Sequence, residues 1–210
     1  MSYTLDPNAA KAADAIIARI EKTGKYLGTF TRAEPVTSKK GTKGVDFSFK
    51  ADTGESADYL TLWTHNGEGK QLQGFNVLMA IMTCLQVRNI AEEVGTVEKY
   101  DQEQKKRIQV DVPLFKELMG KPIGLLLQME EYAKTAGGTA WKPSFFGVFN
   151  KDEFTASEIL NKSKAPETLA KMVLALRDRP LKGSIPVAAA PSATPHDAGS
   201  FNDFEDDLPF

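Results

Sequence analysis

The chain has 210 residues, of which 41% are hydrophobic, and its formal net charge at pH 7 is −2. Such a chain can bury one good core, and it contains no run of about 18 apolar residues that would span a membrane. Its single cysteine, Cys84, excludes an intrachain disulfide and a cysteine-rich metal site. Because the N-terminal residues also lack the basic and apolar segments of a secretory signal, we expect a cytoplasmic protein without a membrane partner.

The charges are unevenly distributed between the body of the chain and its C-terminal end. All 26 Lys and Arg lie at or before Lys182, whereas five of the 28 Asp and Glu lie after it. Residues 1–182 therefore carry a charge of +3, and residues 183–210 carry −5. A mildly basic body with an acidic tail favours nucleic-acid binding with a separate interaction tail.

The first half of the chain predicts a helix, three strands and a second helix. Residues 9–23 favour a helix that stops at Gly24. Residue types then alternate with period two in three aromatic-rich segments, as in half-buried strands. These segments are 25–37, 45–51 and 58–65. The basic segment 38–44 reads as a hairpin loop. The nearly continuous apolar pattern of residues 74–88 predicts a helix packed on most sides, in which Cys84 is an inert core thiol.

The second half of the chain predicts a polar insertion, two strands and a last helix. Residues 89–112 are highly polar and are expected to form a surface insertion. The further predicted elements are a short strand at 107–112, a short helix at 113–120, strands at 121–132 and 143–150, and a helix at 164–178. Beyond Lys182 the composition is rich in Pro, Ala and Ser, which predicts a disordered linker.

This order of elements matches that of the oligonucleotide/oligosaccharide-binding (OB) fold, a five-stranded, partly open barrel with its helix between strands three and four. We therefore predict a mainly β protein with flanking helices, built on an OB-fold five-stranded barrel. The predicted parts of the chain are an N-terminal helix (1–23), the OB domain (24–150), a C-terminal helical segment (151–182), a disordered linker (183–200) and an acidic tip (201–210).

Strand alternation predicts which side chains face the interior of the barrel. The residues expected to point inward are Leu27, Val45, Phe47, Phe49, Leu60 and Leu62. The outer face would then carry aromatic and cationic side chains, namely Tyr26, Phe30, Arg32, Lys50, Tyr59 and Trp63. Single-stranded bases can stack on such a face while the cations follow the phosphates, at roughly 1–3 kcal/mol per stacked base. A shift of one residue would exchange the two faces, so core packing remains the alternative for each aromatic side chain.

Two predicted loops carry the positive charge that a phosphate backbone attracts. In OB folds the loop between strands one and two and the loop between strands four and five border the bound oligonucleotide. The first loop carries Lys39, Lys40 and Lys43, and the second carries Lys134, Trp141 and Lys142. Taken alone, the three lysines of the first loop also fit a solvated loop tip.

The sequence has no pattern typical of a catalytic or cofactor site. His65 and His196 are far apart, and no cluster of His, Cys and carboxylates has metal-ligand spacing. No G-x-x-x-x-G-K-[ST] loop is present to bind ATP phosphates. The adjacent residues Glu92 and Glu93 fit a solvated surface. We therefore expect a protein that is not an enzyme and uses no metal or cofactor.

The last ten residues, FNDFEDDLPF, combine carboxylates with a large apolar end. A functionless solvated terminus does not explain the final Leu-Pro-Phe, because disordered ends are depleted in large apolar groups. The stretch DFEDDLPF resembles the acidic tip of bacterial single-stranded DNA-binding (SSB) proteins, which docks on replication and repair proteins. The resemblance implies that Phe210 is the apolar anchor. The full partner-binding set that it implies is Asp203, Glu205, Asp206, Asp207, Leu208, Pro209 and Phe210.

A second, looser resemblance covers roughly residues 24–150. The segments GKYLGTFTRAEPVTSKKG and GKPIGLLLQ are similar to phage-encoded SSB-like OB-fold proteins. This implies sequence-independent binding of single-stranded DNA in replication, recombination or repair within a phage-infected bacterium, with the tip recruiting partner proteins. The two terminal helices and the 89–112 insertion depart from the family pattern and leave a homo-oligomer and the DNA footprint open. The alternatives are an adaptor that engages SSB partners through its tip with little DNA binding and, more remotely, a metal-dependent nuclease.

Overall fold

The computed structural model describes residues 19–101 and 106–181. The predicted linker (183–200) and the predicted acidic tip (201–210) lie outside the described residues, and so does the predicted N-terminal helix up to residue 18.

The first described residues follow the edge of a sheet. Arg19 forms a parallel bridge with Ser56, and the Ile20 amide donates to the Ser56 carbonyl at 2.8 Å. The Ile20 side chain is buried in the core. Because this pairing holds the backbone extended, the prediction of a helix as far as residue 23 is wrong for residues 19–23.

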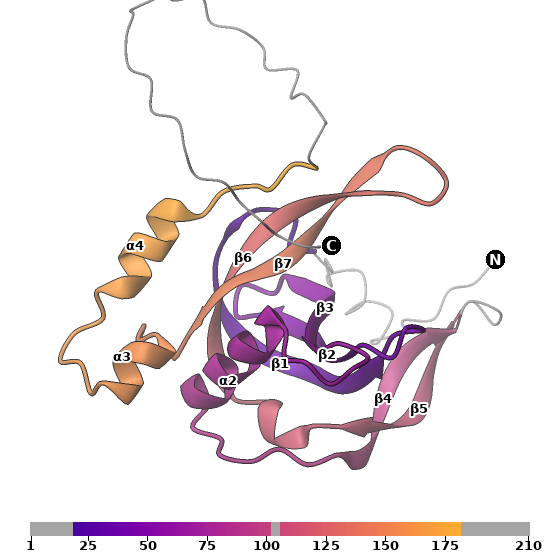
Figure 1. The fold of residues 1–210 in the computed structure, drawn as a ribbon, viewed down its shortest axis with the longest axis horizontal. Helices are drawn as coiled ribbons and strands as arrows, with labels where there is room; N and C mark the ends of the chain where they lie inside the picture. Colours follow the sequence, from indigo (N-terminus) through magenta and orange to yellow (C-terminus); the bar gives the residue numbers. More distant parts are fainter. Residues whose placement is uncertain (1–18, 102–105, 182–210) are drawn as a thin grey trace, which may run out of the picture.

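A five-stranded antiparallel sheet forms the centre of the molecule (Figure 1). Its spatial order is β3–β2–β1–β6–β7. The strands are β1 (Gly24–Thr37), β2 (Lys43–Ala51), β3 (Ser56–His65), β6 (Pro122–Ala133) and β7 (Thr139–Phe149). The edge strands β3 and β7 contact each other, but no hydrogen-bonded ladder joins them within the described residues. The prediction of a mainly β protein with flanking helices is confirmed, whereas the sheet is not closed into a barrel.

The inward residues of β2 and β3 are those that alternation predicts. The buried set includes Val45, Phe47, Phe49, Leu60 and Leu62. On β1 the prediction is wrong, because Leu27 is 38% exposed whereas Phe30 is fully buried. The Phe30 ring contacts the Phe47 ring, with centroids 4.5 Å apart. Phe30 is therefore a core residue.

A bulge in β1 changes which of its later residues face the core. Phe30 pairs with Phe49, but Arg32 pairs with Ser48, so Thr31 is an additional residue in β1. Because such a bulge shifts the alternation by one position, Arg32 lies on the outer face although Phe30 lies inside.

Helix α2 (Gln73–Cys84) packs against β3 and β7 and contributes the buried side chains of Leu78, Ile81, Met82 and Cys84. Burial raises the pKa of the Cys84 thiol to about 12, so the thiol stays protonated and unreactive at neutral pH. This agrees with the expected core helix. No helix in the two described segments is long and apolar enough to cross a membrane.

A separate two-stranded sheet follows α2. It consists of β4 (Glu93–Asp101) and β5 (Lys106–Leu114), and it lies beside the main sheet (Figure 1). Val97, Val112 and Leu114 form its small buried cluster, against which Met119 packs. The polar insertion thus has two full strands where one short strand is predicted. The predicted helix at 113–120 is reduced to the single turn η1 (Lys116–Leu118).

Two short helices, α3 (Ala156–Leu160) and α4 (Thr168–Ala175), complete the described chain. Leu169 and Met172 of α4 pack in a cluster with Leu126 and Phe149 of the sheet. After α4 the chain turns back to the sheet, where the Arg179 amide donates to the Met129 carbonyl at 2.8 Å. This pairing ends the helix before the predicted residue 178.

The buried carboxylate of Glu158 joins the two helices. Its Oε2 accepts from the amide and the hydroxyl of Thr155 at 2.9 and 2.8 Å. Its Oε1 accepts from the amides of Glu167 and Thr168 at 2.8 and 2.7 Å. These hydrogen bonds, first those from the Thr155 and Thr168 amides, lower the pKa of Glu158 to about 2, although burial opposes the shift.

We predict that Glu158→Gln lowers the free energy of unfolding by about 1.5–3 kcal/mol at pH 7, because an amide cannot accept all four hydrogen bonds. The pKa of Glu158 is lower in the folded state than its ordinary value of 4.5. The stabilisation is therefore complete above about pH 4.5 and is lost as the pH falls toward about 2. Urea unfolding between pH 7 and pH 3 should show a difference in the free energy of unfolding between variant and wild type that narrows below about pH 5.

The control for this prediction is Glu167→Gln, at an exposed position, which should change the free energy of unfolding by less than about 0.5 kcal/mol. A Glu158→Gln protein as stable as this control would contradict the prediction.

Candidate nucleic-acid interface

A bulge in β3 exposes Tyr59. The pairing of β2 with β3 shifts by one residue between Phe47 and Phe49, so Asp58 and Tyr59 both lie opposite Ser48. Tyr59 has a φ of 59°, and its side chain is 75% exposed. This left-handed conformation costs about 1–2 kcal/mol for a residue other than glycine. A strained residue that presents an aromatic ring to solvent is a candidate for binding.

The open seam between β3 and β7 contains a cleft of ≈ 530 Å³. Tyr59 and Trp63 border it from β3, and Lys142 borders it from β7. Trp63 is partly exposed and lies over Gly44, where a Cβ would be 3.0 Å from the indole. Arg179 also borders this cleft and is 3.6 Å from Glu130 Oε1.

A second cleft, of ≈ 370 Å³, continues from Tyr59 toward the far end of β6 and β7. Tyr132 and Trp141 border it with Tyr59, and both are partly exposed. The Lys142 ammonium lies 5.7 Å from the centroid of the Tyr132 ring. Because Tyr59 borders both clefts, four aromatic residues border one surface along the seam, with Trp141 on the opposite face of the β6–β7 ladder from Tyr132 and Lys142. We call this surface, formed by Trp63, Tyr59, Tyr132 and Trp141 with Lys142, the seam surface.

The lysines of the β1–β2 loop lie at the Trp63 end of the seam surface. Lys39 and Lys40 are exposed in this loop, and Lys43, which the sequence predicts to lie in it, is the exposed first residue of β2. The loop packs against the turn after β3, because a Cβ on Gly67 would be 2.6 Å from the Lys40 carbonyl. That turn carries Lys70, which is also exposed.

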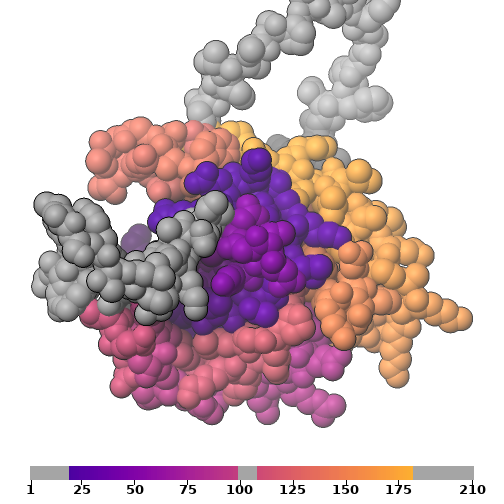
Figure 2. Space-filling model, turned by 180° about the vertical axis from the view of Figure 1, so that it is seen from behind, coloured from indigo at the N-terminus to yellow at the C-terminus, as the bar shows by residue number. Residues whose placement is uncertain are grey.

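The other predicted cations lie toward the opposite end. Lys134 is exposed in the turn between β6 and β7, where its amide donates to the Gly138 carbonyl at 2.9 Å. The end of this hairpin projects beyond the rest of the sheet (Figures 1 and 2). Lys50 is exposed at the end of β2, opposite Ser56, which borders the second cleft.

Arg32 is on the predicted face, but its charge is already compensated. Its guanidinium is paired with Asp46 Oδ2 at 2.6 Å and with Glu34 Oε2 at 3.3 Å. Its Nε donates to Ser48 Oγ at 3.2 Å, and its guanidinium carbon is 5.5 Å from the centroid of the Tyr59 ring. The side chain is only 12% exposed. Arg32 therefore supports Tyr59 and is poorly placed to pair with a phosphate.

Two of the predicted stacking residues face inward. Phe30 is in the core and cannot stack on a base from the surface. Tyr26 packs against the same core, and its hydroxyl donates to the Lys22 carbonyl at 2.7 Å. Burial, followed by the nearby Glu55 charge, raises the pKa of Tyr26. Both errors have one cause: β1 turns Tyr26 and Phe30 toward the core and Leu27 toward solvent, which is the reverse of the predicted alternation.

Tyr132 is the aromatic residue of the seam surface that the sequence prediction missed. It pairs with Ala140 across the β6–β7 hairpin, next to the pair formed by Glu131 and Trp141. Its place at the end of a predicted strand, directly before a loop with a predicted binding residue, is the signal that could have identified it.

No protein-family model matches this chain, and no curated protein sequence matches it. The case for a function therefore rests on the site itself.

Proposed function

We propose that this protein binds single-stranded DNA on the seam surface, with an OB-type fold as its scaffold. The observation that carries the proposal is the set of four exposed aromatic residues that border the two adjoining clefts of the seam, with lysine-bearing loops at either end. Aromatic rings stack with any base, and lysines pair with phosphates, which together give binding without sequence preference. Replication, recombination and repair all expose DNA in this form.

The strand order supports the OB-type scaffold. Strands β1, β2 and β3 form a meander, α2 follows β3, and β6 and β7 complete the sheet beside β1. This order is compatible with that of an OB fold to which the β4–β5 hairpin is added after the helix, and it supports the proposal. OB folds bind oligonucleotides across strands two and three and between the two loops that carry lysines here.

The acidic tip is proposed to recruit partner proteins. The tip carries four side-chain carboxylates and ends in Leu208-Pro209-Phe210. A segment of this composition suits a partner pocket that has an apolar floor and a basic rim, such as those of proteins that bind bacterial SSB tips. The same charges would also compete with DNA for the lysines of the body.

Fluorescence titration with oligo-dT across a range of salt concentrations tests the DNA-binding proposal. The slope of log affinity against log salt is about −0.7 for each phosphate neutralised, so pairing by Lys39, Lys40, Lys43 and Lys142 would give about −3. Lys39→Gln combined with Lys40→Gln should reduce the magnitude of the slope by about 1.4. The control Lys171→Gln, at an exposed position of α4, should leave the slope unchanged. A folded protein that does not bind oligo-dT would favour the adaptor alternative, and Mg²⁺-dependent cleavage would favour a nuclease.

Deleting residues 201–210 is expected to strengthen oligo-dT binding modestly, most at low salt, because a tethered acidic segment then no longer competes for the lysines. Deleting Phe210 alone should abolish binding to exonuclease I, a bacterial SSB partner, and barely change DNA binding. Calorimetric titration of exonuclease I measures the first effect, and oligo-dT titration measures the second. Intact exonuclease I binding after deletion of Phe210 would show that the tip is not an SSB-type docking segment.

A further inference from the structure

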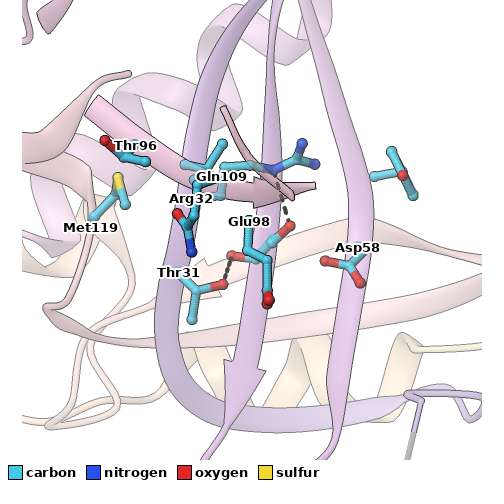
Figure 3. A pocket seen from close by; sticks show the side chains of 10 residues that line it. Thr31, Arg32, Asp58, Thr96, Glu98, Gln109 and Met119 are labelled. Atoms are coloured by element: carbon cyan, nitrogen blue, oxygen red, sulfur yellow. Dashed lines mark hydrogen bonds between the residues drawn. The ribbon is translucent and has the colours of Figure 1, made fainter. Parts of the chain in front are cut away.

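A third cleft adjoins the seam surface at Tyr59. It separates the outer face of β1–β3 from the β4–β5 hairpin and has a volume of ≈ 480 Å³, within the range of about 300–1,000 Å³ typical of small-ligand sites (Figure 3). Thr31 and Arg32 border it from β1, Asp58 from β3, and Glu98 and Gln109 from the hairpin. We call it the hairpin cleft.

The charges of the hairpin cleft do not suit a phosphate. Arg32 is the one cation among the described residues that border it, and Arg32 is already paired with Asp46 and Glu34. The carboxylates of Asp58 and Glu98 border the same space. The Asp58 carboxylate would repel a phosphate group there, so this cleft favours the base of a nucleotide over its phosphate.

The polar groups of the hairpin cleft suit a base that carries an exocyclic amino group. Carboxylates accept a hydrogen bond from the N4 amino group of cytosine, and the Gln amide can bond the edge of a base in two directions. Within the described part of the chain, the side chains of Asp58 and Gln109 have no hydrogen-bond partner, so a base does not have to displace one. Thymine carries a carbonyl oxygen where cytosine carries N4, and that oxygen would face a carboxylate.

Tyr59 connects the hairpin cleft to the seam surface. It borders this cleft and both clefts of the seam. Its ring is supported by the Arg32 guanidinium at 5.5 Å, and its backbone is held in a left-handed conformation. A strand that stacks along the seam therefore passes the mouth of the hairpin cleft at Tyr59.

We propose that the hairpin cleft receives one base of the bound single strand and selects cytosine over thymine, with Asp58 accepting from the base N4 amino group. This inference rests on the proposed DNA-binding function and adds a preference at one base position to stacking that is otherwise independent of sequence. It also gives the β4–β5 hairpin a role as the outer wall of a base-reading site.

The test compares oligo-dC with oligo-dT of equal length at one salt concentration, because both are pyrimidines of similar size. The wild-type protein should bind oligo-dC at least about fivefold more tightly, since a good base-edge contact discriminates by about 1–3 kcal/mol. Asp58→Ala should remove the preference by weakening binding to oligo-dC while leaving that to oligo-dT unchanged or slightly tighter. Asp58 is exposed, so the variant is expected to fold, and its melting temperature verifies this.

The control is Asp111→Ala, which removes an exposed carboxylate from the β4–β5 hairpin, where it accepts a hydrogen bond from the Thr96 hydroxyl at 2.6 Å. It should keep the preference for oligo-dC. Equal wild-type affinity for the two oligonucleotides would overturn the inference and leave the proposed function intact. Equal strengthening of both by Asp58→Ala would also overturn it, because only general repulsion would have been removed. Failure to bind either oligonucleotide would instead contradict the proposed function.

Discussion

A variant that carries both Tyr59→Ala and Trp141→Ala is expected to bind oligo-dT more weakly by about 2–6 kcal/mol, since each stacked base contributes about 1–3 kcal/mol. The two side chains border one cleft and are 75% and 46% exposed. Their removal therefore takes little apolar area out of the core, and the melting temperature should change little. Fluorescence anisotropy with labelled oligo-dT measures the binding, and thermal unfolding of the same sample verifies the fold.

Leu174→Ala is the matched control, because Leu174 is a 79% exposed apolar residue on α4, away from the seam surface. It should leave oligo-dT binding unchanged. Tyr59→Gly distinguishes the contribution of the ring from that of the strained backbone. It should weaken oligo-dT binding, because the ring is lost. It should also raise the free energy of unfolding by up to about 1–2 kcal/mol, because glycine adopts a positive φ without strain. Wild-type affinity in a folded double variant would show that the seam surface is not where bases stack.

Phe30→Ala is expected to lower the free energy of unfolding by about 3–5 kcal/mol, as is typical when a buried Phe is truncated. Phe30 is 0% exposed, and its ring contacts those of Phe47, Phe49 and Phe145. Urea unfolding followed by tryptophan fluorescence measures the loss. Any fall in DNA binding should then follow the loss of folded protein and recover under conditions that restore the fold.

Leu27→Ala, on the same strand, is the control for Phe30→Ala. Leu27 is 38% exposed, so its truncation should cost less than about 1.5 kcal/mol. The sequence pattern predicts the opposite ranking of these two residues. A stable Phe30→Ala protein with impaired DNA binding would support that pattern against the structure.

How clearly residue alternation marks the buried face differs from strand to strand, for physical reasons. On β2 and β3, polar residues separate Val45, Phe47, Leu60 and Leu62, so alternation identifies the buried face. On β1, Tyr26 and Leu27 are adjacent and both apolar, so the pattern fits either face. The bulge at Thr31 then reverses the alternation, and no local residue pattern marks it.

Some residues of the candidate site were predictable from the sequence, but their arrangement was not. Exposed aromatic residues on β3 and in the β6–β7 loop, such as Trp63 and Trp141, could be named from the sequence. The clefts between them depend on β3 and β7, which are far apart in the chain and meet only across the open seam. The sequence predicts only one short strand in the region of the β4–β5 hairpin. The hairpin buries few apolar side chains, so its strands do not alternate clearly between apolar and polar residues, which is the signal for a half-buried strand.

The position of β1 also has a consequence for the order of folding. β1 pairs with β2 through a short hairpin, but it pairs with β6 between residues about a hundred positions apart, such as Gly24 and Leu127. Local hairpins form in about 1–10 μs. A ladder between distant segments forms more slowly, because closing the long loop between them costs conformational entropy before any pairing contact is made. The β1–β2–β3 meander and the β6–β7 hairpin are therefore expected to form as separate units, and their union along β1 sets the overall rate. The seam surface has residues from β3 in the first unit and from β6 and β7 in the second. It therefore forms only when the two units pair along β1.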